Sequence, residues 1–150
     1  HAAATVEQMM TLNRSAARAA ANVPLHASTD ITGFGLAGHC WEVATNSSVL
    51  LELDLPTLPT LDGLEDAIAA EFGTGGQSNN REYFGAELRI DGELSPLEDA
   101  LLFDPQTSGG LLFTLAPAAA TILADQLTAA GVSHWQIGRV REGHGIRAVR

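Results

Sequence analysis

Thr29-Asp30-Ile31-Thr32-Gly33-Phe34-Gly35 and Asp104-Pro105-Gln106-Thr107-Ser108-Gly109-Gly110 are the two stretches that decide how this chain folds and what it can bind. Each one places an acidic side chain and hydroxyl groups next to closely spaced glycines. Glycine has no Cβ, so its backbone can approach a ligand or another chain segment closely. The first stretch runs into a helical pattern, and backbone N–H groups at the positive end of such a helix favour an anion such as phosphate.

The carboxylate of Asp30 has two interpretations that the residues alone leave open. A carboxylate beside a phosphate site suits Mg²⁺, a hard ion that usually takes one or two carboxylates together with phosphate oxygens. Alternatively, Asp30 or Thr32 caps the following helix, and the glycines only allow close packing. The stretch 104–110 has a similar structural interpretation, since an Asp-Pro pair starts a turn and a glycine pair enters a strand.

Hydrophobic spacing predicts the helices and strands on either side of these stretches. Helices are expected at 6–21, opened by a Thr5–Gln8 capping box, at 34–46, from a cap at Asp62 through 72, and from Pro117 to Gly131. Strands are expected at 49–55, 87–90, 110–115, 135–140 and 145–149, and a polar loop at 73–80. Because these elements alternate irregularly, the pattern predicts an α+β fold with helices packed against a mixed β-sheet.

Composition limits the class of protein. The chain has 150 residues, 45% of them hydrophobic, so residues 1–150 are predicted to form a single domain with one core. The 18 acidic residues outnumber the 8 basic ones, all arginine, and the net charge of −10 argues against nucleic acid and membrane surfaces as partners. A single cysteine and no signal-peptide pattern favour a cytoplasmic protein. Since the sequence starts at His1 directly before a helix, we expect it to be part of a longer polypeptide.

Other reactive side chains are assigned structural roles. Cys40 lies on the apolar face of the predicted helix 34–46, so it is expected to be a buried residue and not a nucleophile. The histidines are too scattered for a zinc site. Asp99 and Asp104 are expected to cap loops, in preference to acting as an acid and base pair, and Arg81 is expected in a solvated loop.

The two glycine-containing stretches together resemble the C-terminal domain of selenophosphate synthetase (selenide, water dikinase). Thr29 to Gly35 matches the family motif Thr-Asp-x-Thr-Gly-Phe-Gly, and Asp104 to Gly110 matches a second family motif at every position. Leu12-Asn13-Arg14 and Gly138-Arg139-Val140 look like the segments that precede the first motif and close the domain. The resemblance covers nearly the whole chain and is weakest between 47 and 102.

The resemblance implies an α+β fold shared with the C-terminal domain of aminoimidazole ribonucleotide synthetase. It implies a two-domain enzyme whose N-terminal ATP-binding domain forms the homodimer and is not included in this sequence. Family members convert selenide, ATP and water to selenophosphate, AMP and phosphate with Mg²⁺, and the motif aspartate, here Asp30, is a metal ligand. The reactive Cys or selenocysteine and its Lys belong to the N-terminal part, so no catalytic residue is assigned to this chain, which is expected to be inactive alone.

Two alternatives stay open. One keeps the superfamily but changes the chemistry to another ATP-using enzyme, such as aminoimidazole ribonucleotide synthetase, thiamine-monophosphate kinase or a hydrogenase-maturation dehydratase, although the stretch 104–110 argues against it. The other is a non-catalytic interaction module, whose former domain interface is exposed when the chain is isolated. We also expect the glycines of 104–110 to shape the interface with the N-terminal domain.

Overall fold

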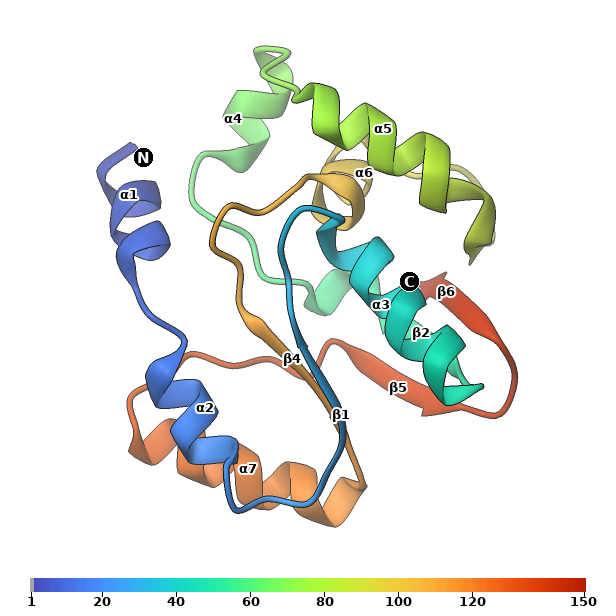
Figure 1. The fold of residues 1–150 in the computed structure, drawn as a ribbon. Helices are drawn as coiled ribbons and strands as arrows, with labels where there is room; N and C mark the ends of the chain where they lie inside the picture. Colours follow the sequence, from blue (N-terminus) through green and yellow to red (C-terminus); the bar gives the residue numbers. More distant parts are fainter. Residues whose placement is uncertain (1) are drawn as a thin grey trace.

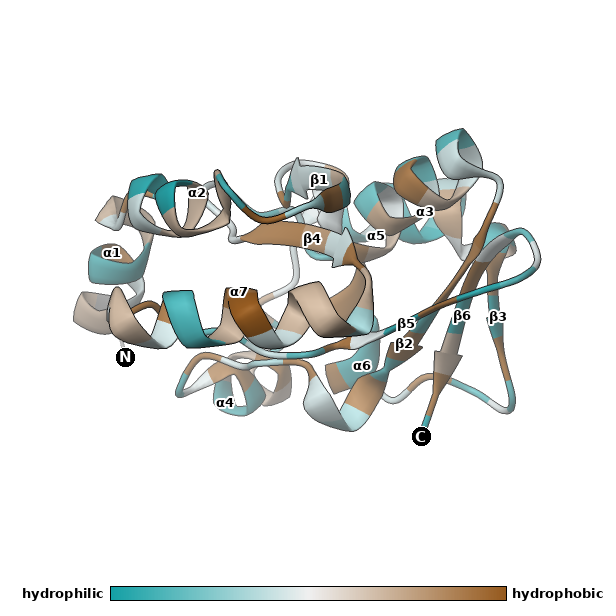
Figure 2. Ribbon diagram, turned by 90° about the horizontal axis from the view of Figure 1, so that it is seen from below, coloured by the Kyte–Doolittle hydropathy of each residue, from teal (hydrophilic) through white to brown (hydrophobic). Residues whose placement is uncertain are grey.

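Two separate β-sheets organise the computed structural model, which describes residues 2–150. The predicted α+β fold with a mixed sheet is confirmed, because the larger sheet contains both parallel and antiparallel strand pairs, and a second, two-stranded sheet lies apart from it. The smaller sheet pairs β1 (Leu25–Asp30) with β4 (Leu111–Leu115) (Figure 1), and the larger sheet has the strand order β3-β6-β2-β5 (Figure 2). Its four strands are β2 (Leu50–Asp54), β3 (Leu88–Ile90), β5 (Gly138–Arg141) and β6 (Gly145–Val149).

The larger sheet carries the main hydrophobic core. Strand β2 pairs antiparallel with β5 and parallel with β6, and β6 pairs parallel with β3. Helices α3 (Gly35–Ser47) and α6 (Pro96–Phe103) lie beside this sheet (Figure 2). Residues 51 and 53 of β2 and 146 and 148 of β6 face the helices and are buried, as the period of two in a strand requires. Leu102, Phe103 and Cys40 fill the space between sheet and helices.

The smaller sheet carries a second core. Strand β1 (Leu25–Asp30) pairs antiparallel with β4 (Leu111–Leu115), and helices α2 (Arg14–Ala20) and α7 (Pro117–Ala129) pack against each other beside it (Figure 1). The buried residues of this core are Ala20, Val23, Ala119, Leu123 and Leu127. Each strand of a two-stranded sheet lies at an edge, which explains why β4 is half-buried throughout in spite of its continuous apolar run.

The remaining elements are α1 (Ala2–Met10), α4 (Leu64–Ala69), α5 (Gly75–Phe84) and the 3₁₀ turns Leu55–Thr57 and Gly85–Glu87. Helix α5 contacts α3 and α6, and α4 contacts α6. No helix in the described part of the chain combines the length and the apolar character that crossing a membrane requires.

Three details of the predicted helices are wrong. The helix expected at 6–21 is interrupted between α1 and α2. Asn13 takes the N-cap position of α2, but its side chain donates to the Gly109 carbonyl and does not cap the helix. Helix α1 already begins at Ala2, so Thr5 lies inside the helix and does not open a capping box. Helix α4 starts after Gly63, which has a left-handed φ of 87° and no side-chain cap, so Asp62 does not cap it.

The segment 73–80, predicted to be a loop, contains most of helix α5. The Thr74 hydroxyl accepts a hydrogen bond from the Gln77 backbone N–H at 3.1 Å, which starts the helix in spite of its two glycines. Phe84 at the other end is buried and anchors the helix to the main core. Strand β1 and helix α6 were not predicted at all.

Cys40 is fully buried on α3, as predicted, and burial raises the pKa of its thiol to about 12. A thiol must ionise and reach solvent to react, so we expect Cys40 in the native protein to react with a disulfide reagent at least about 100-fold more slowly than in guanidinium chloride. Absorbance of the released thiolate measures both rates. Equal rates in the two conditions would contradict this position for Cys40.

Arg150 clamps the start of α6. Its guanidinium contacts the two carboxylate oxygens of Glu98 at 2.7 and 2.8 Å, and it donates to the backbone carbonyls of Asp91 and Glu93 at 3.1 and 2.8 Å. Glu98 also forms a capping box with Ser95. The Arg150 hydrogen bond is the largest of the contacts that lower the pKa of Glu98 from its ordinary 4.5 to about 2.

This pKa shift predicts an acid-dependent contribution to stability. Because the folded pKa of Glu98 lies below its unfolded value, the contribution is complete above about pH 4.5 and is lost as the pH falls toward 2. In Glu98→Gln, the free energy of unfolding should therefore depend less steeply on pH across that window. Glu93→Gln is the control, because Glu93 contributes only its backbone carbonyl to the clamp. Urea titrations at several pH values measure the slopes, and parallel slopes for Glu98→Gln and wild type would count against the clamp.

Candidate functional site

The two motif stretches lie side by side. Strand β1 ends at Asp30 and β4 begins at Leu111, and these two residues are paired in the antiparallel register. The pairing continues past the strands, because the Ile31 N–H donates to the Gly110 carbonyl at 2.9 Å and the Gln106 N–H donates to the Thr32 carbonyl at 3.0 Å. The chain thus brings together two segments that are far apart in sequence.

Glycine is required where the two motifs touch. A Cβ at Gly109 would overlap the carbonyl oxygen of Ile31, so any side chain at 109 would force the motifs apart. Gly35 opens α3 with a left-handed φ of +66°, and a Cβ there would lie 2.9 Å from the Leu102 carbonyl oxygen of α6. Close backbone approach thus fixes the first motif against both the second motif and α6.

Two asparagine side chains bind backbone carbonyls in the motifs and directly beside them. The Asn13 amide donates to the Gly109 carbonyl at 2.9 Å, and the Asn80 amide donates at 2.9 Å both to Gly33 and to Phe103. Sequence reasoning missed Asn80, because its segment was assigned to a loop. The signals that could have found it are the Thr74 cap and the i, i+4 spacing of Asn80 and Phe84, which are both buried.

Asp30 presents an exposed carboxylate at the end of β1. The interpretation of Asp30 or Thr32 as a helix cap is wrong, because α3 has Phe34 at its N-cap and no capping hydrogen bond from a side chain. The Thr32 hydroxyl instead lies 3.2 Å from Nε2 of His39. Within residues 2–150, no hydrogen bond or ion pair engages the side chain of Asp30, so its oxygens are available to a ligand.

The donor set of this chain fits a partial metal site. The described residues form no group of three or more His, Cys, Asp or Glu side chains placed to hold a metal ion. A single carboxylate is nevertheless a normal protein contribution to bound Mg²⁺, which keeps several waters and takes phosphate oxygens from its nucleotide. Asp30 is suited to that role by its oxygen donors and its exposure.

The acidic side chains near the second motif have structural partners. Asp99 lies within α6, where it accepts a hydrogen bond from Gln77 at 2.9 Å and pairs with Arg81 at 3.1 Å. Asp104 takes the C-cap position of α6 and accepts from the hydroxyl of Thr74 at 3.1 Å. The predicted loop-capping role of Asp99 is therefore wrong, and so is the solvated loop for Arg81, whose guanidinium lies 5.1 Å from the centre of the Phe103 ring.

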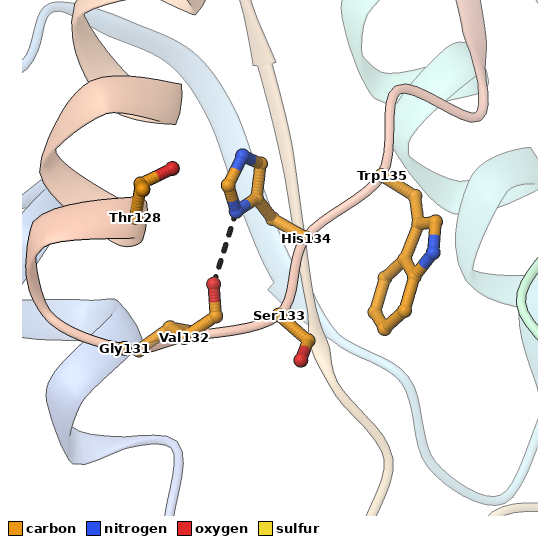
Figure 3. A pocket seen from close by; sticks show the side chains of 6 residues that line it. All are labelled: Thr128, Gly131, Val132, Ser133, His134 and Trp135. Atoms are coloured by element: carbon orange, nitrogen blue, oxygen red, sulfur yellow. Dashed lines mark hydrogen bonds between the residues drawn. The ribbon is translucent and has the colours of Figure 1, made fainter.

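The pocket drawn in Figure 3 is a different place on the molecule. It follows the C-terminus of α7, and its lining residues are Thr128, Gly131, Val132, Ser133, His134 and Trp135. His134 is held by its own backbone segment, with Nδ1 3.0 Å from the Val132 carbonyl oxygen. No lining residue belongs to either motif, so the candidate site is the motif pair and not this pocket.

Comparison with known proteins matches both the fold and the sequence. A family model described as AIR synthase related protein, C-terminal domain, matches residues 2–150. A selenide, water dikinase from Burkholderia orbicola is 44% identical over 72% of this chain, and one from Nitratidesulfovibrio vulgaris is 35% identical over 90% of it. The matches cover only 30% and 39% of those relatives, so this chain spans about a third of their length.

Solved structures share the fold at lower identity. A thiamine-monophosphate kinase from Stenotrophomonas maltophilia covers 83% of this chain with a TM-score of 0.55 and 21% identity, and the match spans 31% of that protein. The thiamine monophosphate kinase of Aquifex aeolicus covers 97% of this chain with a TM-score of 0.54 and 21% identity, and the match spans 39% of that protein. At this identity the likeness establishes the fold alone.

The contact at Gly109 gives a sharp test of the motif pairing. We expect Gly109→Ala to lower the free energy of unfolding by about 3 kcal/mol or more, because the new methyl group meets a backbone carbonyl that cannot move without breaking the pairing. Gly110→Ala is the matched control, since a Cβ at 110 has no atom within 4 Å. Urea denaturation of both variants measures the difference. If the two variants are equally stable, the close approach of the motifs is wrong.

Proposed function

Because this chain belongs to the AIR synthase related family as a C-terminal domain, we propose that it is the C-terminal part of a selenide, water dikinase. That enzyme makes selenophosphate, AMP and phosphate from selenide, ATP and water. The observation that carries the proposal is the pairing of Thr29–Gly35 with Asp104–Gly110, two motifs of selenophosphate synthetase that this fold joins through their backbones. Identities of 35–44% to curated relatives of that name support it.

In this proposal, Asp30 is the metal ligand that the domain contributes. Mg²⁺ bound at such a site offsets negative charge on the phosphate oxygens of ATP. The protein supplies the placement: strand pairing with Leu111 fixes the backbone of Asp30, and the Gly109 contact fixes the residue that follows. The carboxylate stays exposed, where it can face groups that the rest of the enzyme provides.

The rest of the enzyme supplies the nucleophile, the Lys and most of the nucleotide contacts in this proposal. Our chain has no lysine and one cysteine, and Cys40 is buried with its pKa raised to about 12, which leaves no thiolate for attack. A structure of AaThiL complexed with AMPPCP and TMP shares the fold, which supports ATP as a substrate. We accordingly propose a cytoplasmic homodimeric enzyme in which this domain, residues 1–150, is inactive alone.

Exposed apolar side chains support a missing domain partner. Met10, the last residue of α1, and Leu12, two residues later, are 75% and 69% exposed, and Phe72, after α4, is 78% exposed. Large apolar side chains exposed to this degree are typical of surfaces that another part of a protein covers. The same exposure favours self-association of the isolated chain, which is the interaction-module alternative.

A second candidate function is another ATP-using reaction of the superfamily, such as phosphorylation of thiamine monophosphate. The shared fold of the thiamine-monophosphate kinases favours it, but their identity to this chain is 21%. The higher identity to the selenide, water dikinases, together with the stretch 104–110, favours selenophosphate synthesis.

Phosphorus NMR of ATP with Mg²⁺ and selenide, under anaerobic conditions, tests the proposal. We expect the full-length protein to form selenophosphate and AMP and this chain alone to form neither. Full-length Asp30→Asn should turn over at least about 100-fold more slowly, because it loses the charge that holds the metal ion. Asp125→Asn, an exposed aspartate on α7, is the matched control and should keep full activity.

Each other outcome has a definite meaning. Turnover by this chain alone would show that it carries its own nucleophile. Full activity of Asp30→Asn would remove Asp30 from the metal site. In a parallel reaction with thiamine monophosphate added in place of selenide, phosphorylation of the thiamine monophosphate would identify the second candidate function.

A further inference from the structure

We propose that Asn80 is a positioning residue of the site, which sets the spacing between the two motifs through both hydrogens of its side-chain amide. Asn80 is 8% exposed and is one of two polar residues that are buried in the described part of the chain. Its Nδ2 lies 2.9 Å from the Gly33 carbonyl oxygen and 2.9 Å from the Phe103 carbonyl oxygen. The inference rests on the proposed function for its metal-dependent part.

The chemistry of the two partners fixes the orientation of this amide. Both are backbone carbonyls, which only accept hydrogen bonds, so both hydrogens of the Asn80 NH₂ group must point at them. Each carbonyl belongs to a different motif region: Gly33 lies within the first motif, and Phe103 directly precedes Asp104. One planar group of fixed size therefore spans the two motif regions.

Helix α5 holds Asn80 rigidly enough to act as this spacer. On one side Gln77 and Arg81 bind Asp99 of α6 at 2.9 and 3.1 Å. At the end of the helix Phe84 is buried against Phe34, with ring centres 5.7 Å apart. Helix α5 is thus held by contacts to α6 and to Phe34, the residue after Gly33. The position of the Asn80 amide is therefore fixed relative to both motif regions.

The geometry connects Asn80 to the metal ligand through the backbone. Gly33 is three residues after Asp30, and the segment between them is also held by the Ile31 and Thr32 backbone hydrogen bonds to the second motif. Loss of the Asn80 amide leaves the buried Phe103 carbonyl and the partly buried Gly33 carbonyl without this donor, which favours conformations in which the motifs separate. Asp30 then spends less time where a metal ion and nucleotide need it.

The test compares Asn80→Asp with Asn79→Asp in the full-length protein. Both variants add one carboxylate to α5, but Asn79 is exposed and binds neither motif, so it is a matched control. At a temperature where circular dichroism shows both variants folded, the Mg²⁺ concentration for half-maximal turnover should rise about tenfold in Asn80→Asp, with a smaller change in kcat at saturating Mg²⁺. Asn79→Asp should match wild type. Asn80→Ser, which replaces the two amide donors by one shorter hydroxyl without adding charge, should give an intermediate rise and serves where Asn80→Asp does not fold.

Hydrogen exchange separates this inference from the proposed function. The Ile31 and Gln106 amides, which bond across the two motifs, should exchange at least about tenfold faster in Asn80→Asp than in Asn79→Asp. If wild type makes no selenophosphate, the proposed function fails and the exchange rates alone decide the role of Asn80. Equal exchange rates and equal Mg²⁺ dependence in the Asn80 and Asn79 variants would overturn the inference.

Discussion

Backbone contact between the two motif stretches is the constraint on which the rest of this structure depends. Ile31 and Thr32 exchange hydrogen bonds with Gly110 and Gln106, and Gly109 fits against Ile31 only because it lacks a side chain. The larger sheet and its core meet this contact from one side, through α3 and α6, and the smaller sheet continues it on the other. Both cores thus meet at the place where the candidate ligand Asp30 stands.

The division of labour between the two cores follows from this arrangement. Helix α3 follows the first motif and helix α6 precedes the second, so the packing of these helices on the larger sheet sets the direction of the motif backbones. The pair α2 and α7 buries a small core of alanine and leucine beside β1 and β4, and Asn13 at the start of α2 reaches Gly109. The packing of the two cores therefore determines the positions of the motif carbonyls and of the exposed Asp30 carboxylate.

Much of the fold could be predicted from the sequence where periodicity is strong. The apolar stripe of α3, the alternation in β2 and the Pro117 start and Gly131 end of α7 each have a local signal, and the structure confirms them. Strand β1 has alternating half-buried and exposed residues with little apolar content, so its strand state depends on its partner β4. Helix α5 is largely polar, and Asn80 is important only through carbonyls 47 and 23 residues away, which no local pattern encodes. The Asp30 assignment came from family resemblance, and its metal role stays a prediction.

The distance along the chain between the two motifs has a consequence for biosynthesis. Asn13 and Gly109 are 96 positions apart, so the contact between them closes a loop that contains most of the protein. Such long-range closure is slow, because its entropy must be lost before any of its contacts form. On the ribosome, strand β1, which ends at Asp30, has no strand partner until β4, after α6, has emerged. The first motif therefore takes its final position late in synthesis, and a chain interrupted before β4 would contain this motif without the strand and the backbone hydrogen bonds that hold Ile31 and Thr32.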